Sequence, residues 1–246
     1  MFADWMVALE ERHLSDLRFQ EVTRALRALS ARYVSRRGGD VQRSLDTRGK
    51  RAAFALYYAP LHFLATDLVV RALGAQTPAP RSIIDIGCGT GAAGAAWALA
   101  AGGSPQITGI DRHPWAVDEA QWTYRTLGVS ARARQGDATR LPAFRAGSAF
   151  VAAYVMNELP EAERLALETA LIDAAGRGAR VLIIEPISRR ISPWWDAAAY
   201  RLASAGGRAD EWRFSVELPP LLRLLDKAAG LDHRELTARS IYVPEA

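Results

Sequence analysis

The residues best suited to chemistry lie in one stretch, Asp85-Ile-Gly87-Cys88-Gly89-Thr-Gly91. The β-branched run from Ile83 to Ile86 predicts a short, fully buried strand in front of it. The glycines predict a turn in which backbone N–H groups approach a ligand closely. The alanine-rich run from Ala92 to Ala101 predicts a helix that begins at the glycines. Together these elements predict a nucleotide-type site at the carboxyl edge of a sheet.

Two ligand patterns fit this loop. Gly89-Thr-Gly91-Ala-Ala-Gly94 fits the dinucleotide pattern G-x-G-x-x-G. Asp85 favours a different ligand, because its carboxylate suits an ammonium and a sulfonium better than a pyrophosphate. Asp85 to Gly91 resembles motif I of the class I S-adenosylmethionine (SAM) methyltransferases, which implies cofactor contacts from Asp85, Gly87, Cys88, Gly89 and Gly91. Without a partner histidine nearby in the sequence, we interpret Cys88 as a small residue that fits the turn, not as a nucleophile.

Acidic residues follow the next two predicted strands. The strand Gln106 to Ile110 ends at Asp111, where a ribose-binding carboxylate belongs in both the NAD and the SAM interpretation. The strand Ser130 to Gln135 runs into Gly136-Asp137-Ala138-Thr-Arg-Leu-Pro. This segment is similar to the methyltransferase pattern G-D-A-x-x-L-P, which implies that Asp137 accepts a hydrogen bond from the adenine amino group. Three residues that neighbour these motifs complete the expected cofactor site, namely Arg112, Ala138 and Tyr154.

The fourth predicted strand, Ala149 to Val155, leads into Met156-Asn157-Glu158-Leu-Pro. In the class I fold this strand end faces the methyl group and the acceptor, and the loop resembles the V-L-H-E-L type. Asn157 can orient an acceptor but cannot act as a base near neutral pH. Glu158 is either a base or a residue of a helix first turn. Glu185, at the end of the fifth strand from Arg180 to Ile184, is a further candidate base.

Helices are expected before the first strand. We predict one helix from Phe2 to Ser35, with an apolar stripe that begins at Phe19. A second helix, Ala52 to Leu73, is rich in aromatic residues and should be kinked or divided by Pro60. Helices in this place often cover the ligand site in SAM methyltransferases. This implies three residues that line the site or pack in the core, namely Tyr57, Tyr58 and His62, of which Tyr58 and His62 are candidate catalytic residues.

Basic residues crowd the N-terminal region. We expect either a solvated surface or contact with an anionic acceptor such as RNA. The chain carries a formal net charge of +4, which permits an anionic partner without requiring one. The basic residues are Arg18, Arg24, Arg27, Arg32, Arg36, Arg37, Arg43, Arg48, Lys50 and Arg51.

Alternation of strands and helices from Arg81 onward predicts an α/β fold with a doubly wound, mostly parallel Rossmann-like methyltransferase sheet and an N-terminal helical extension. We divide the chain into a helical cap and substrate region, 1–76, and a SAM-binding domain, 77–246. The segment at about 187–217 carries adjacent tryptophans, Trp194 and Trp195, and is expected to form a substrate lid or wall. At 246 residues, half of them apolar, the chain is long enough for this core.

A narrower resemblance concerns the acceptor. Short segments, among them Ala28 to Tyr33, Tyr154 to Pro160 and Glu211 to Ser215, look like the mitochondrial ribosome small-subunit methyltransferase-like family and its bacterial relatives. The only cysteine is Cys88, so the chain lacks the cysteine cluster that holds an iron–sulfur centre in many of those proteins, and no metal site is expected. This absence argues against a ribosomal role.

The sequence favours a SAM-dependent enzyme that methylates oxygen or nitrogen, with a small-molecule acceptor preferred. The alternatives are an rRNA or ribosome-assembly methyltransferase-like protein, a SAM-binding assembly factor without catalysis, and an NAD(P)-dependent oxidoreductase. Acidic residues near the N-terminus argue against a signal peptide, and glycines interrupt the longest uncharged run, so we expect a cytoplasmic protein without a membrane span. The oligomeric state stays open.

Overall fold

A seven-stranded sheet organises the computed structural model, which describes residues 1–35, 45–231 and 233–245. The strand order is β3-β2-β1-β4-β5-β7-β6, with β7 antiparallel to β5, β6 antiparallel to β7, and the other neighbours parallel. The strands are β1 (Ser82–Ile86), β2 (Gln106–Asp111), β3 (Ala131–Gln135), β4 (Ala149–Ala153), β5 (Arg180–Glu185), β6 (Arg208–Ser215) and β7 (Glu235–Val243). The predicted α/β class with a mostly parallel sheet is confirmed.

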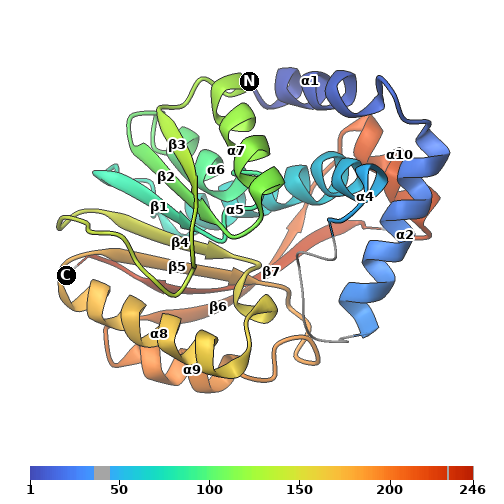
Figure 1. Ribbon diagram of the computed structural model, residues 1–246. Coiled ribbons are helices and arrows are strands. Elements are labelled where there is room, and N and C mark those ends of the chain that lie inside the picture. Colours follow the sequence, from blue (N-terminus) through green and yellow to red (C-terminus); the bar gives the residue numbers. More distant parts are fainter. Residues whose placement is uncertain (36–44, 232, 246) are drawn as a thin grey trace.

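Helices cover both faces of this sheet (Figure 1). One face carries α5, α6 and α7, and the other carries α8 and α9. Their bounds are α5 (Ala59–Leu73), α6 (Ala92–Ala100), α7 (Pro114–Thr126), α8 (Glu161–Gly176) and α9 (Trp195–Ala203). Such a sheet is hidden from water on both sides, which explains the uninterrupted apolar runs of its central strands.

Strand β5 shows how the core is divided. All six of its residues are buried. Leu182 and Ile184 pack with the cluster that contains Trp97 of α6, whereas Val181 and Ile183 pack with the cluster beneath α8 and α9. Successive side chains on a strand point to opposite faces, so one apolar run supplies both cores.

The N-terminal extension consists of two helices, α1 (Phe2–Leu14) and α2 (Phe19–Ser35). The prediction of one continuous helix from Phe2 to Ser35 is therefore wrong. The chain turns between them, and Glu21 accepts a 2.9 Å hydrogen bond from the Arg18 backbone N–H at the start of α2. This reach from the first turn back to the residue before the helix is the acidic half of a capping box. The basic residues Arg36, Arg37 and Arg43 lie outside the described residues.

The aromatic run is helical throughout but changes its winding. It comprises α4 (Arg48–Ala53), a π-helical turn, η1 (Phe54–Tyr58), and α5. Pro60 lacks an N–H and its ring would crowd the carbonyl one turn earlier, which the wider π turn relieves. Residues 48–73 are long and apolar enough to span a membrane, but 61% of the most apolar window is buried inside the protein. This run is therefore a core helix of the fold. Its winding changes just before Pro60, where the sequence predicts a kink or a division.

The segment 187–217 contains an element that the sequence analysis did not predict. Residues 208–215 form β6 at the edge of the sheet, paired along its length with β7. Trp212 and Phe214 lie on one face of this strand with their rings stacked, the centroids 5.7 Å apart. The expected lid is therefore interrupted by a sheet strand, and helix α10 (Pro220–Ala229) follows it.

Candidate active site

The glycine loop joins β1 to α6 as predicted, and side chains from other elements pack closely against two of its glycines. Gly87 has a φ of +60°, and a Cβ added there would lie 2.2 Å from the Val155 side chain. Gly91 has a φ of +79°, and its added Cβ would lie 2.6 Å from the ring of Tyr124 in α7. Side chains at these two positions would be strained and would collide, so the loop requires glycine there.

Asp85 lies beneath this loop and is 1% exposed. Its Oδ2 accepts a 2.8 Å hydrogen bond from the Gly94 backbone N–H in the first turn of α6. Burial raises the pKa of the Asp85 carboxyl to about 7. The carboxyl therefore anchors the helix to the strand and shapes the loop from below, and its direct contact with a ligand stays a prediction.

Cys88 is also buried under the loop. Its backbone N–H donates to the Ile110 carbonyl of β2 at 3.0 Å, and its Sγ lies 2.9 Å from the position of a Cβ added to Gly109. Burial raises the pKa of the Cys88 thiol, so it stays protonated at neutral pH. This environment is that of a packing residue.

Asp111 meets the glycine loop at the end of β2. Its Oδ2 accepts a 2.9 Å hydrogen bond from the Gly89 N–H, and its Oδ1 accepts one of 2.8 Å from the His113 N–H. Each carboxylate oxygen can accept a further hydrogen bond. A Cβ added to Gly89 would project toward the ring of Phe54, 3.6 Å away. The loop backbone, Asp111 and Phe54 thus lie against one another at the end of β2, and we call this group the cradle.

Asp137 follows β3 on the same edge and is tied down by Arg112. The Arg112 Nη2 donates to Asp137 Oδ1 at 2.8 Å and to Glu163 Oε2 at 2.7 Å. The Thr139 N–H and hydroxyl also donate to Oδ1, each at 2.9 Å. Arg112 and these bonds lower the pKa of Asp137 to about 2. Ala138 beside it is buried. The structure thus gathers Asp111, Arg112 and Asp137 at one edge, with Asp137 ionised.

An aromatic cluster covers the loop from the N-terminal side. The His62 ring stacks on Tyr154 with centroids 3.9 Å apart and planes 13° apart, and Tyr58 lies 6.1 Å from His62. Burial lowers the pKa of His62 to about 3 and raises that of Tyr58 to about 12, so both side chains are neutral at pH 7. Tyr154 has a φ of +60°, a strained conformation for a non-glycine residue that often marks functional sites. We call Phe54, Tyr58, His62 and Tyr154 the aromatic roof.

Tyr57, the remaining aromatic candidate, points away from the loop. It is 1% exposed, and its hydroxyl hydrogen-bonds Asp226 of α10. This hydroxyl also lies 3.1 Å from the His233 ring nitrogen Nδ1. Tyr57 is therefore a core residue that fixes the roof to α10, as the packing alternative had it.

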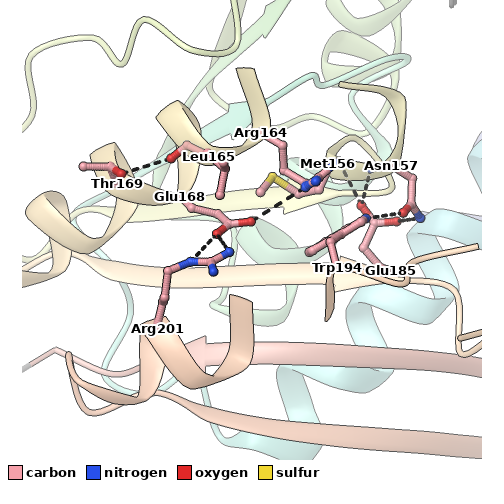
Figure 2. A network of polar contacts seen from close by, with 9 residues as sticks. All are labelled: Met156, Asn157, Arg164, Leu165, Glu168, Thr169, Glu185, Trp194 and Arg201. Atoms are coloured by element: carbon pink, nitrogen blue, oxygen red, sulfur yellow. Dashed lines mark hydrogen bonds and ion pairs between the residues drawn. The ribbon is translucent and has the colours of Figure 1, made fainter. Parts of the chain in front are cut away.

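The ends of β4 and β5 are joined by a buried polar network (Figure 2). Glu185 Oε1 accepts from the Met156 N–H at 2.8 Å, and Oε2 accepts from the Asn157 side-chain amide. The Trp194 Nε1–H donates to Asn157 Oδ1 at 2.9 Å, which fixes the orientation of the amide. Burial raises the pKa of Glu185 to about 8, and the neighbouring Glu158 charge also raises it. Glu158 itself ends the 3₁₀ turn η2 (Met156–Glu158) before α8.

Two residues of this site were not assigned by the sequence analysis. Phe54 belongs to the helix for which the sequence predicts only an aromatic content, and the pairing of Trp194 with Asn157 joins segments that no local pattern connects. The adjacent tryptophans were the available signal, and only one of them, Trp194, reaches the network. Trp195 is buried under the Arg239 guanidinium, which lies 4.6 Å from its ring centroid.

With this geometry established, the chain can be compared with known proteins. The family model described as a methyltransferase domain matches residues 83–175, from β1 into α8. Those residues form a class I SAM-dependent methyltransferase domain. The prediction of such an enzyme with SAM as its cofactor is confirmed, and we set the oxidoreductase alternative aside. Among curated proteins, none matches this methyltransferase.

Solved structures share the fold of the methyltransferase. One is the plantazolicin methyltransferase BamL, with a TM-score of 0.53 and 11% identity, covering 90% of this chain and 98% of that one. Another is magnesium protoporphyrin IX methyltransferase from Synechocystis PCC 6803 with bound S-adenosylhomocysteine, with a TM-score of 0.51 and 16% identity, covering 88% of this chain and 92% of that one. At these identities the likeness concerns the fold alone.

The side chains of the methyltransferase fit its cofactor. A hydroxyl-rich sugar suits the unfilled acceptor positions of Asp111, and an added Cβ at Gly89 would intrude on the space under Phe54. The ionised Asp137 suits an amino group of a base, beside the small Ala138. These contacts are the ones that the motifs implied, and each stays a prediction for the individual residue.

Proposed function

We propose that the methyltransferase acts on an oxygen or nitrogen atom of a small molecule that binds beneath the aromatic roof. The observation that carries this proposal is the stack of His62 on Tyr154, which brings a ring from α5 against the end of β4. Phe54, from the same helical run, faces the glycine loop. An acceptor between roof and loop is thereby enclosed by rings, as small ligands usually are.

SAM supplies a methyl group on a positively charged sulfur, which is already an activated leaving group. The task of the protein is therefore to orient the acceptor and to exclude water. The aromatic roof serves the second need, because its rings exclude water from the site. Asn157 and Glu185 serve the first, because their network fixes the loop after β4.

His62 is the residue that we assign to the acceptor proton. Its neutral ring carries one N–H donor and one nitrogen that accepts a hydrogen bond. The accepting nitrogen can orient the O–H or N–H of an acceptor, while the low pKa of about 3 makes the ring a weak base. Glu185, with a pKa raised to about 8, is protonated at neutral pH and has a positioning role.

A small-molecule acceptor also agrees with the neighbours in structure. Their names state a porphyrin for one and a plantazolicin analogue for the other. Because the likeness concerns the fold alone, these names guide the choice of compounds to test and carry no further weight.

The experiment is a screen in which S-adenosylhomocysteine release is measured with aromatic alcohols, amines and carboxylic acids, and separately with RNA. Turnover with a small molecule and none with RNA supports the proposal, whereas turnover with RNA alone contradicts it. With the acceptor found, His62→Phe keeps a ring on Tyr154 but removes both nitrogens. We expect kcat to fall about tenfold, the scale of one hydrogen bond made in the transition state.

The affinity of the His62→Phe variant for S-adenosylhomocysteine serves as the internal control, and we expect it to change less than about twofold, far below the effect of one hydrogen bond. His62→Gln restores an acceptor atom and should recover part of the lost turnover. An unchanged kcat in His62→Phe would show that His62 only packs.

A further inference from the structure

A pocket with a volume of about 190 Å³ lies outside the methyl-transfer site. It is formed where the turn between α1 and α2 meets α4 and the start of α7. None of its lining residues comes from the glycine loop, the aromatic roof or the network around Glu185. The side chains that matter for its chemistry are Arg12, His13, Asp16, Arg48, Arg51 and Trp115.

The charges around this pocket do not balance. Arg12 is held by the buried carboxylate of Glu119, with Nη2 to Oε2 at 3.1 Å, and His13 lies 2.7 Å from the same carboxylate. Glu119 is therefore already matched by two partners. Arg48 pairs with Asp16 at 2.9 Å, but both side chains are largely exposed, so this pair contributes little.

Arg51 is the lining arginine whose charge these ion pairs do not neutralise. Its Nε donates to the Leu45 carbonyl at 2.8 Å, which orients the guanidinium. Among the residues that the structure describes, no carboxylate lies within ion-pair distance of Arg51. Burial lowers the pKa of His113, and the positive charge of Arg51 lowers it further. Arg48 and Arg51 are three residues apart on α4 and so share a face of that helix.

Trp115 adds an apolar wall to this basic pocket. The Arg51 guanidinium carbon lies 5.8 Å from the Trp115 ring centroid. The ring is held in place at the start of α7, where the Trp115 N–H donates to His113 Nδ1 at 3.1 Å. His113 in turn donates its own N–H to Asp111. The pocket is thus distinct from the cofactor cradle but connected to it through two hydrogen bonds.

We propose that this pocket binds the phosphate monoester group of a small ligand, with Arg48 and Arg51 on the phosphate oxygens and Trp115 against the adjoining apolar atoms. A planar guanidinium matches the oxygens of a phosphate in pairs, and two of them suit a dianion better than a single carboxylate charge. A water molecule takes about 30 Å³ of liquid, so the pocket has room for a phosphate and a short adjoining group. The proposal does not depend on which acceptor is methylated.

The test is calorimetric titration of the full chain with phenyl phosphate, compared with inorganic phosphate and benzoate. We expect phenyl phosphate to bind more tightly than either, and its affinity to fall as salt is added. Arg51→Gln should raise the Kd of phenyl phosphate about tenfold or more, the scale of one charge-assisted hydrogen bond. Arg48→Gln should raise it as well, which guards against an unfolded Arg51 variant.

The matched control is Arg223→Gln, an exposed arginine of α10 outside the pocket, which should leave the Kd unchanged. Unfolding curves of all variants check the fold. Equal affinity of the parent and both pocket variants for phenyl phosphate overturns the proposal. It is also overturned if phenyl phosphate does not bind and a single-stranded RNA oligonucleotide binds the parent but not Arg51→Gln.

The source of the phosphate is resolved by competition. If an acceptor from the screen displaces phenyl phosphate, the phosphate group belongs to the acceptor. If both bind together, the pocket serves a separate phosphorylated ligand. Either result supports a phosphate site, and failure of the acceptor screen leaves this titration intact.

Discussion

Asp111→Asn is the most direct test of the cofactor cradle. In the parent, the two carboxylate oxygens accept the N–H groups of Gly89 and His113 at 2.9 and 2.8 Å. The asparagine amide keeps the shape but replaces one oxygen with an NH₂ group, which faces a backbone donor. One buried N–H then loses its acceptor, and we expect the free energy of unfolding to fall by about 1–3 kcal/mol.

The affinity of Asp111→Asn for S-adenosylhomocysteine should fall for a separate reason. A hydroxyl that donates to a charged carboxylate contributes about 1.5–3 kcal/mol, and the substitution removes the charge. At 1.4 kcal/mol for each factor of ten, the Kd of S-adenosylhomocysteine should rise about 10- to 150-fold. Asp111→Ala removes both oxygens and should weaken binding further. Calorimetric titration measures the affinity, and urea unfolding measures the stability.

Cys88→Ala is the control in the same loop. Its thiol points toward Gly109 beneath the loop, so the substitution should cost about 1 kcal/mol of stability and leave the affinity nearly intact. If folded Asp111→Asn binds S-adenosylhomocysteine within about twofold of the parent, the loss expected from a charged hydrogen bond is missing and the ribose assignment is refuted.

Other parts of the site give three further predictions. Gly94→Ala would place a Cβ 2.7 Å from Asp85 Oδ2, so urea unfolding should show a loss of about 1–3 kcal/mol, and an unchanged midpoint would contradict the packing described here. Trp194→Phe removes the donor to Asn157, and we expect kcat to fall by about threefold to tenfold with the S-adenosylhomocysteine affinity preserved; equal kcat would show that the network is dispensable. The pKa of Glu185 is raised to about 8 in the folded protein, so its stabilising contribution is present below the unfolded pKa near 4.5 and is lost as pH rises through about 8. Urea unfolding across this range should show a steeper decline in the parent than in Glu185→Gln, and parallel curves would argue against the raised pKa.

The cofactor edge was predictable because its constraints are local. A glycine loop after a buried strand fixes where the next helix begins, and consecutive parallel strands bring Asp111 and Asp137 to the same edge. What the sequence did not indicate is the depth of Asp85. An acid before the first glycine fits a ligand in the pattern, but its burial and its bond to Gly94 depend on how α6 packs on β1.

The errors lie where two patterns compete. Residues 211–214 alternate charged and aromatic side chains with the period of a half-buried strand, but the adjacent tryptophans earlier in the segment favoured a lid. The break between α1 and α2 has a sequence signal in Glu21, three residues after Arg18, because this spacing is that of a capping box, whereas the apolar stripe alone predicts one helix. The strand period in β6 and the capping box before α2 are both present in the sequence. The tryptophans and the apolar stripe instead favoured a single lid and a single helix.

The aromatic roof could not be predicted from any local pattern, because its contacts join segments far apart in the chain. His62 contacts Tyr154 because α5 packs over the end of β4, and the strained backbone of Tyr154 lies at that same strand end. We predict that the loop and its acids serve a cofactor that many acceptors can share, and we propose that the roof encloses the acceptor. Substitutions of Tyr58 or His62, the two roof residues outside the expected cofactor site, should therefore change which acceptor is methylated while the affinity for S-adenosylhomocysteine is kept, and substitutions at Asp111 should do the reverse.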